Sequence, residues 1–288
     1  MPMKPAAMIE QAGDADPAFA TTLAKGLAVL EAFSGASARL SNSEIAIATG
    51  LARPTVARLT QTLCDLGYLN RTSERGKYRL WTRALSIAHP LLAEMTFRQI
   101  ARPLMQELSA SVRGTVSIGM LDGLDLIYVE TARSGDLGAH IPDIGSTVPL
   151  VRMAMGRSLL SMLPESERRA LEDRYVAERP ELWGTYEAAV NDGLSEISER
   201  GFCASHGDWV SSIHSVGTPL FRDDGEGGIC FAINCGIPAF RLRTDELEGE
   251  IGPRLLDLAR AIRVAARLPE PPMPAAANAR KRKGVPFA

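Results

Sequence analysis

The stretch 53–62 and the residues just before it carry side chains that proteins use to hold double-stranded DNA. Arg58 is long enough to reach O6 and N7 of a guanine, and hydroxyls such as those of Ser43 and Thr55 can hold a phosphate. The candidate contacts here are Ser43, Arg53, Pro54, Thr55, Ala57, Arg58, Gln61 and Thr62. Because most of these groups are small or polar, they suit a surface that enters a groove.

The elements that must position these residues are three short helices. Apolar spacing at Leu23, Leu27, Leu30 and Phe33 predicts the first helix. A capping box at 41–44 opens the second helix, 42–49, and Gly50 ends it. Pro54 then opens a third helix, whose apolar face (Val56, Leu59, Leu63 and Leu66) turns the candidate contacts outward. Two helices joined by so tight a turn predict a helix-turn-helix.

A basic hairpin is predicted directly after the third helix. Residues 68–71 and 77–80 read as its strands, with a loop at 72–76. A hairpin in this position is typical of a wing. Arg75, Lys77 and Arg79 would lie near the DNA backbone or the minor groove.

Charge is divided unevenly along the 288 residues. The whole chain has a net charge of −2, yet residues 21–90 carry +5 and residues 97–268 carry −7. This asymmetry is expected when only the first part meets a polyanion. With 45% apolar residues and no apolar run long enough to cross a bilayer, we expect a globular cytoplasmic protein.

Several segments together resemble the IclR-type bacterial transcription regulators. The resemblance begins at 23–30, 44–46, 51–59, 63–69 and 78–80, which match the winged helix of that family. It continues through 101–108, 148–150, 154–160, 200–202 and 216–220, which match the effector-binding domain in order and spacing. It covers about residues 21–268. The family implies a ligand-responsive regulator of a metabolic, catabolic operon and not an enzyme.

The fold class expected is α+β. Past Gly114, strand and helix patterns alternate, and an acidic, glycine-rich turn at 223–228 suggests an antiparallel hairpin. The resemblance to the family implies that this unit is a GAF-like effector domain. We expect a disordered tail at 1–20, the winged helix-turn-helix domain at 21–83, a linker helix at 84–96, the effector domain at 97–268 and a disordered basic tail at 269–288. Pro90 and Pro103 are expected to interrupt their helices.

The resemblance also implies where an effector binds. Family positions that line the effector site fall here on Val148, Ala154, Met155, Asp208, His214, Thr218, Leu220, Ile233, Asn234 and Cys235. Amides at the start of the Gly156 helix would suit a small carboxylate. The chain has Arg157 where relatives commonly have Lys. Met153 and Met155 make the entrance of the effector site bulkier and more flexible than an Ala or Thr would. Among small organic acids, the hypothesis is therefore a larger or partly apolar acid, for example an aromatic one, over the smallest keto acids.

Two alternatives compete with this interpretation. One is a cytosolic enzyme that uses Cys203 or Cys235 as a nucleophile beside His206 or His214, with the helix-turn-helix as an interaction module. The chain has no nucleophile-elbow, phosphate-loop or zinc-protease motif to support it. The other is a protein that binds DNA without sequence preference.

No cofactor or metal is expected, because the four cysteines show no metal-ligand spacing. The expected partners are operator DNA, a small-molecule carboxylate and a second copy of the chain, as a homodimer or a dimer of dimers.

Overall fold

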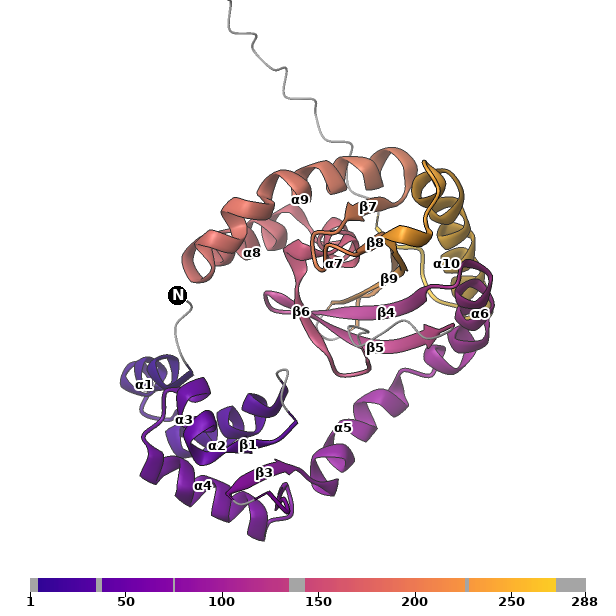
Figure 1. Cartoon of the computed structure of the whole chain (residues 1–288). Helices are drawn as coiled ribbons and strands as arrows, with labels where there is room; N and C mark the ends of the chain where they lie inside the picture. The colour runs from indigo at the N-terminus through magenta and orange to yellow at the C-terminus, as the bar shows by residue number, and fades with distance from the viewer. Residues whose placement is uncertain (1–4, 35–37, 75, 135–142, 226–227, 273–288) are drawn as a thin grey trace, which may run out of the picture. The chain divides into compact units, whose positions relative to one another are not determined.

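The computed structural model describes residues 5–34, 38–74, 76–134, 143–225 and 228–272. The chain forms two compact units, Met1–Met95 and Thr96–Ala288, and each is described by itself (Figure 1). Within the described residues, no helix is both long enough and apolar enough to cross a membrane.

The first unit is a bundle of short helices with a small sheet. Its elements are α1 (Pro5–Ala15), α2 (Thr21–Glu31), a 3-10 turn (Ala32–Ser34), β1 (Leu40–Ser41), α3 (Asn42–Thr49), α4 (Arg53–Asp65), β2 (Leu69–Arg71), β3 (Lys77–Leu80) and α5 (Thr82–Glu94). The strands are antiparallel in the order β1-β3-β2. Buried side chains that include Val29, Ile45 and Val56 form its core. Apolar spacing thus folds α2, α3 and α4 together, as expected.

The N-terminal prediction is wrong over most of its length. Residues 5–15 form helix α1 instead of a disordered tail, with Ile9 buried and Ala6 packed against the core of the first unit. Burial of these small apolar groups stabilises a helix that composition alone disfavours. At the other end, residues 268–272 have no regular structure, and the predicted tail at 273–288 lies outside the described residues.

The second unit is built on one antiparallel sheet. Its strands are β4 (Thr115–Asp122), β5 (Asp125–Arg133), β6 (Thr147–Pro149), β7 (Cys203–His206), β8 (Ile213–Asp223) and β9 (Ile229–Pro238), in the order β6-β5-β4-β9-β8-β7. The helices are α6 (Phe97–Val112), α7 (Ala154–Ser161), α8 (Glu165–Glu178), α9 (Pro180–Arg200) and α10 (Gly252–Ala266), with short helical turns at Leu150–Arg152, Ala239–Arg241 and Leu247–Ile251. This is the α+β fold that the sequence predicts.

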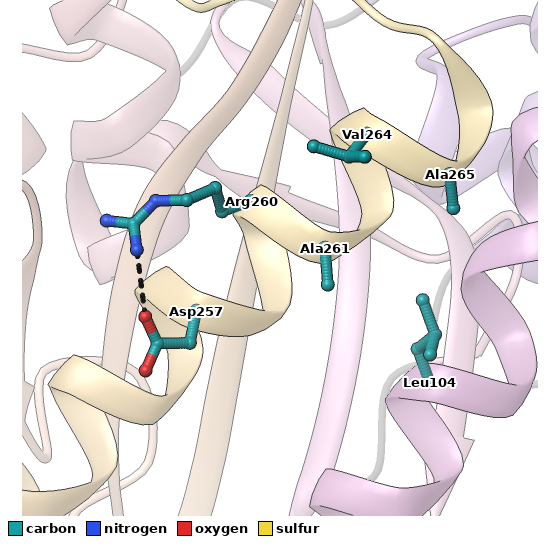
Figure 2. A pocket seen from close by; sticks show the side chains of 6 residues that line it. All are labelled: Leu104, Asp257, Arg260, Ala261, Val264 and Ala265. Carbon is teal, nitrogen blue, oxygen red and sulfur yellow. Dashed lines mark hydrogen bonds and ion pairs between the residues drawn. The ribbon is translucent and has the colours of Figure 1, made fainter.

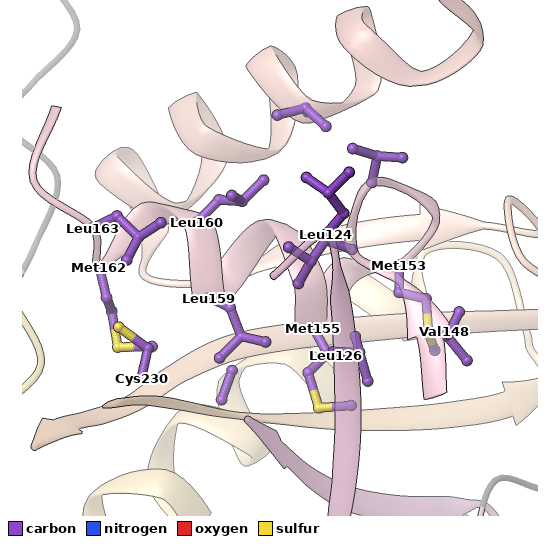
Figure 3. Packing of buried hydrophobic residues seen from close by; sticks show 14 of the residues in the cluster. Leu124, Leu126, Val148, Met153, Met155, Leu159, Leu160, Met162, Leu163 and Cys230 are labelled. Atoms are coloured by element: carbon purple, nitrogen blue, oxygen red, sulfur yellow. The ribbon is translucent and has the colours of Figure 1, made fainter. Parts of the chain in front are cut away.

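The helices divide between the two faces of the sheet. On one face α6 and α10 lie side by side (Figure 1). Glu130 of β5 points to this face, since Arg98 and Arg102 of α6 both pair with its carboxylate. On the other face α7 packs on β8 and β9 over a large apolar cluster, which α8 and α9 help to enclose (Figure 3).

Two prolines do not interrupt their helices. α5 runs through Pro90 and α6 runs through Pro103, although each proline removes one backbone hydrogen bond. Packing compensates in α6, where Ala101 and Met105 on either side are fully buried. No side chain of α5 is buried, and the structure shows no comparable compensation at Pro90.

Candidate functional site

The helix-turn-helix is held in shape by local hydrogen bonds. At the start of α3 the Ser41 hydroxyl accepts from the Glu44 amide at 3.3 Å, and the Glu44 carboxylate accepts from the Ser41 amide at 2.7 Å. These bonds hold the pKa of Glu44 below its usual value. Gly50 ends α3 with φ 78°, which favours glycine. The buried hydroxyl of Thr60 in α4 donates to Oδ1 of Asn42 at 3.0 Å and ties α4 to α3.

Most predicted DNA contacts on α4 share one exposed surface. Arg53, Pro54, Ala57, Arg58, Gln61 and Thr62 are exposed, while Ser43 and Thr55 are half-buried. No side chain caps α4, so its first amides are open to a phosphate. Among the described residues, Arg53 and Arg58 have no ion-pair partner and remain available for DNA.

Other members of the predicted set already have intramolecular partners. Gln61 donates to Asp65 at 2.7 Å and accepts from Arg71 at 2.6 Å, and the Thr62 hydroxyl donates to the backbone oxygen of Arg58. Sequence reasoning missed Arg71, whose cation lies next to α4 through this bond. Its position in the strand directly after the third helix was the sequence feature that could have indicated a cation beside α4.

Two basic residues of the wing have partners within the unit: one stacks on an aromatic ring and the other forms an ion pair with a carboxylate. The Arg79 guanidinium lies 4.8 Å from the ring centroid of Trp81, and the Lys77 ammonium pairs with Glu74 at 3.3 Å. Arg39, another missed residue, also bonds Glu74, and these two cations lower its pKa. Arg75 lies outside the described residues.

The sheet separates the ten predicted effector residues, so they cannot line one pocket. Gly217 of β8 faces α7, because a Cβ there would lie 2.6–2.7 Å from the backbone of Ala154 and Met155. Asn234 pairs with Gly217 and shares that face. Its neighbours Ile233 and Cys235 point to the α6/α10 face. On the α7 side lie Val148, Ala154, Met155 and Asn234, while Thr218, Ile233, Cys235 and His214 face the other way and Leu220 lies in a bulge.

A row of polar side chains crosses the α7 face beneath the start of α7. The Thr131 hydroxyl of β5 lies 3.2 Å from that of Ser117 on β4, and Ser117 is paired in register with Asn234. Asn234 is only 5% exposed, and no described residue donates to its Oδ1 atom. A buried acceptor without a donor is costly unless something else satisfies it. This row is therefore suited to a polar ligand.

α7 brings its N-terminus to this row. All eight of its residues are buried, and no side chain caps its first turn. The amides of a first helical turn have no acceptors within the helix and carry a partial positive charge. Gly156 is required here, since a Cβ would lie 1.9 Å from the Leu150 oxygen. A carboxylate is the natural ligand for such a site.

Three side chains hold loop 206–212, which connects β7 to β8, beside α7. Arg157, only 3% exposed, pairs with the Asp208 carboxylate and donates to the Ala204 oxygen at 3.0 Å. Arg152 donates to the Trp209 oxygen at 3.0 Å, and the Tyr186 hydroxyl donates to the Asp208 oxygen at 2.9 Å. The predicted effector residue Asp208 thus has a structural partner, Arg157, which the sequence marked only as a departure from the family.

A nucleophilic cysteine does not fit this structure. Burial raises the pKa of Cys203 and of Cys235 to about 12, so both stay as thiols at neutral pH. Cys203 lies on the α7 face, where its sulfur is 3.3 Å from the Ala154 oxygen. Its strand neighbours alternate in direction, which places His206 beside His214 on the opposite face. No group of three or more metal ligands occurs within the part of the chain that the structure describes.

An open groove of about 540 Å³ lies between α6 and α10, away from α7 (Figure 2). Leu104, Ala261, Val264 and Ala265 line it, with Asp257 and Arg260 at one side. These two charges pair with each other at 3.0 Å. The groove therefore offers no free cation to a carboxylate and does not resemble an effector site.

A winged helix-turn-helix with an open α4 surface, followed by an α+β unit with a buried polar row, defines the class of transcription regulators that bind DNA. The chain belongs to the IclR family. The model described as "IclR helix-turn-helix domain" matches residues 22–73, and that described as "Bacterial transcriptional regulator IclR C-terminal" matches residues 89–264. Members are transcription regulators and not enzymes, so the enzyme alternative is set aside.

Relatives and solved structures agree with this assignment. The Pca regulon regulatory protein of Pseudomonas putida is 28% identical over 87% of this chain and 85% of its own. The p-hydroxybenzoate hydroxylase transcriptional activator of Acinetobacter baylyi is 26% identical over 84% and 90%. An IclR family regulator of Brucella abortus has 35% identity and a TM-score of 0.74, covering 88% and 94%. An IclR homologue of Microbacterium hydrocarbonoxydans complexed with 4-hydroxybenzoate has the same fold at 20% identity, with a TM-score of 0.66 and coverage of 85% and 99%.

Proposed function

We propose that this protein is a cytoplasmic regulator of a catabolic operon, and that a small, aromatic carboxylate controls its binding to an operator. The observation that supports a carboxylate is the uncapped, buried N-terminus of α7, whose first amides are donors. Asn234 lies beneath it, and its Oδ1 atom, an acceptor without a donor among the described residues, would accept from a hydroxyl group of the effector. Relatives named for the Pca regulon and for p-hydroxybenzoate hydroxylase support an aromatic acid.

Operator recognition is assigned to the exposed face of α4. In this proposal Arg58 reads a guanine, while Arg53 and the first amides of α4 hold phosphate. Arg79 and Lys77 contact the backbone or the minor groove from the wing. Ser43 and Thr55 are close enough to the turn to add phosphate contacts although both are half-buried.

A second copy of the chain is proposed to complete the DNA-binding form. α2 exposes Leu23 and Leu27 at 64% and 49%, and α5 exposes Leu85, Ile87 and Leu91 at 72%, 64% and 51%. Exposed apolar side chains one helical turn apart, such as Leu23 and Leu27 or Ile87 and Leu91, mark interfaces between proteins. A symmetric dimer would read a pseudo-palindrome, and sedimentation velocity distinguishes it from a dimer of dimers.

The test is fluorescence anisotropy of the full chain with duplex DNA from its own upstream intergenic region. A scrambled duplex serves as the reference, and both are titrated across salt with benzoate, 4-hydroxybenzoate and their amides. We expect a preference of about 1,000-fold for the intergenic duplex. We also expect that an acid changes this affinity by about 5- to 150-fold, the usual range of coupling between two sites.

Two outcomes would contradict the proposal separately. Equal, weak binding to both duplexes would remove operator recognition by α4 and favour binding without sequence preference. A preference for the intergenic duplex that no acid alters would retain the regulator and remove the carboxylate effector. Arg58→Ala is the variant that tests operator recognition by α4 directly. Arg58 is exposed and has no ion-pair partner among the described residues, so its replacement should leave the fold intact.

A further inference from the structure

A buried hydroxyl group on the α7 side of the sheet has only a weak partner. Tyr128 lies on β5, in register with Gly119 of β4, and its side chain is fully buried. Its hydroxyl lies 3.2 Å from the sulfur of Met153, to which it donates. A thioether is a weak acceptor, whereas buried hydroxyls ordinarily donate to oxygen. Tyr175, in the same cluster, does donate to a backbone oxygen, that of Leu124.

The weak bond places the Tyr128 hydroxyl close to the start of α7. Met153 is the N-cap residue of α7, and its side chain lies in the same cluster as Val148 (Figure 3). Asn234 lies on the sheet near the same helix end, since its register partner Gly217 packs against the backbone of Ala154. Two donors that could bind an anion, the first amides of α7 and the Tyr128 hydroxyl, therefore lie toward the same end of the helix. Asn234 adds an acceptor without a donor among the described residues, which could bind a hydroxyl group of the ligand.

A flexible side chain fills the space between them. The methyl carbon and sulfur of Met155 lie 3.0 and 3.1 Å from where a Cβ of Gly119 would stand. Gly119 is flanked by Tyr128 on β5 and by Ala232 on β9, the residue two before Asn234. Methionine has three rotatable side-chain bonds and adapts to irregular space. The space is closed in this structure by a side chain that has other rotamers available.

We propose that Tyr128 is a specificity-determining residue that donates its hydroxyl hydrogen to the carboxylate of the effector. Ligand entry displaces the Met153 sulfur from the Tyr128 hydroxyl. The Met155 side chain changes rotamer, and the aromatic ring of the effector occupies the space that it leaves. The inference rests on the effector role proposed above for the α7 side. Burial also raises the pKa of Tyr128, so the phenol stays a neutral donor beside the anion.

The experiment compares the full chain with its Tyr128→Phe variant by calorimetric titration of benzoate and 4-hydroxybenzoate, each paired with its neutral amide. A hydrogen bond to a charged group predicts that Tyr128→Phe weakens acid binding by about 10-fold or more, while amide binding changes by less than about 2-fold. Tyr175→Phe is the matched control, because it removes a hydroxyl from the same cluster and should leave acid binding within about 2-fold.

The outcomes separate this inference from the proposed function. Unchanged acid binding by Tyr128→Phe, or an equal loss for acid and amide, overturns the role of Tyr128 and leaves the effector class standing. If the unaltered chain binds none of these acids, the proposed aromatic effector fails and the inference fails with it.

A second variant keeps the inference testable if Tyr128→Phe does not fold. Met153→Leu nearly conserves volume but removes the sulfur that competes for the hydroxyl. We expect it to tighten acid binding by about 2-fold or more without tightening amide binding. Weaker acid binding in Met153→Leu overturns the inference.

Discussion

The guanidinium of Arg157 and the carboxylate of Asp208 form an ion pair that joins α7 to loop 206–212. The Ser205 hydroxyl donates to the same carboxylate oxygen at 3.0 Å. The arginine side chain reaches the loop past Gly193 of α9, where a Cβ would lie 2.7 Å from its Cδ atom. The loop beside the proposed effector site is therefore held by a buried cation and is not a free lid.

Removing the carboxylate of this pair should destabilise the second unit. Asp208→Asn leaves the buried Arg157 without its anionic partner, but Asp208 is 28% exposed and water compensates in part. We expect a loss of about 1–3 kcal/mol in the free energy of unfolding by urea, with faster proteolysis within residues 206–212. Glu165→Gln breaks an exposed helix pair with Arg169 and should cost no more than about 0.5 kcal/mol. Equal losses in the two variants would show that the buried pair has no special role.

The capping box of α3 should contribute stability that depends on pH. Ser41→Ala removes the side-chain cap and is expected to cost about 1 kcal/mol at pH 7. Because the folded-state pKa of Glu44 is lowered, its contribution is present above the unfolded pKa and is lost as pH falls through the folded value. Thermal unfolding of both proteins at pH 7 and at pH 3 should therefore show a smaller difference at pH 3. A difference that grows on acidification contradicts this account.

Replacing Arg58 of α4 and replacing Arg79 of the wing should change DNA binding in different ways. Arg58→Ala should reduce the preference for the intergenic duplex over the scrambled one, because the residue is assigned to a base edge; a loss of about 1–3 kcal/mol is typical. Arg79→Ala should weaken both duplexes alike and lower the slope of log affinity against log salt by about 1. Anisotropy across salt measures both. The reverse pattern would exchange the roles of α4 and the wing.

The three buried cysteines should be nearly inert to thiol reagents in the folded protein. Burial raises the pKa of Cys203 and Cys235 to about 12 and that of Cys230 to about 11, while Cys64 is half-buried. Reaction with a disulfide reagent at pH 8, followed by mass spectrometry, should label Cys64 first and the others only after unfolding. Rapid labelling of Cys203 in the folded protein would revive a nucleophilic role for it.

Local signals in the sequence predicted the first unit well, because helix caps act over a few residues. The capping box at Ser41 and the left-handed residue Gly50 both lie where the sequence placed them. Helix α1 was missed, since its stability comes from burial of Ile9 and not from local pattern.

The candidate effector site was predicted only in part, because a strand reverses its face at every residue. The predicted trio Ile233, Asn234 and Cys235 cannot share one pocket, and the register with Gly217 selects Asn234. Tyr128 and Arg157 were not predicted to act there. The bonds that single them out are made to residues far away in the chain, Met153 and Asp208, and no local pattern encodes such pairs.

Three of the glycines in and around α7, at positions 119, 156 and 217, constrain which positions can be substituted. A methyl group at 156, 217 or 119 would lie 1.9, 2.6 or 3.0 Å from its nearest neighbour, and for 156 and 217 that neighbour is backbone. Backbone cannot rotate away, so mutations at these two positions are barred unless the helix itself shifts. At the proposed effector site, changes are therefore confined to the side chains of β5, β9 and the first turn of α7, which can be replaced while the backbone around them stays the same.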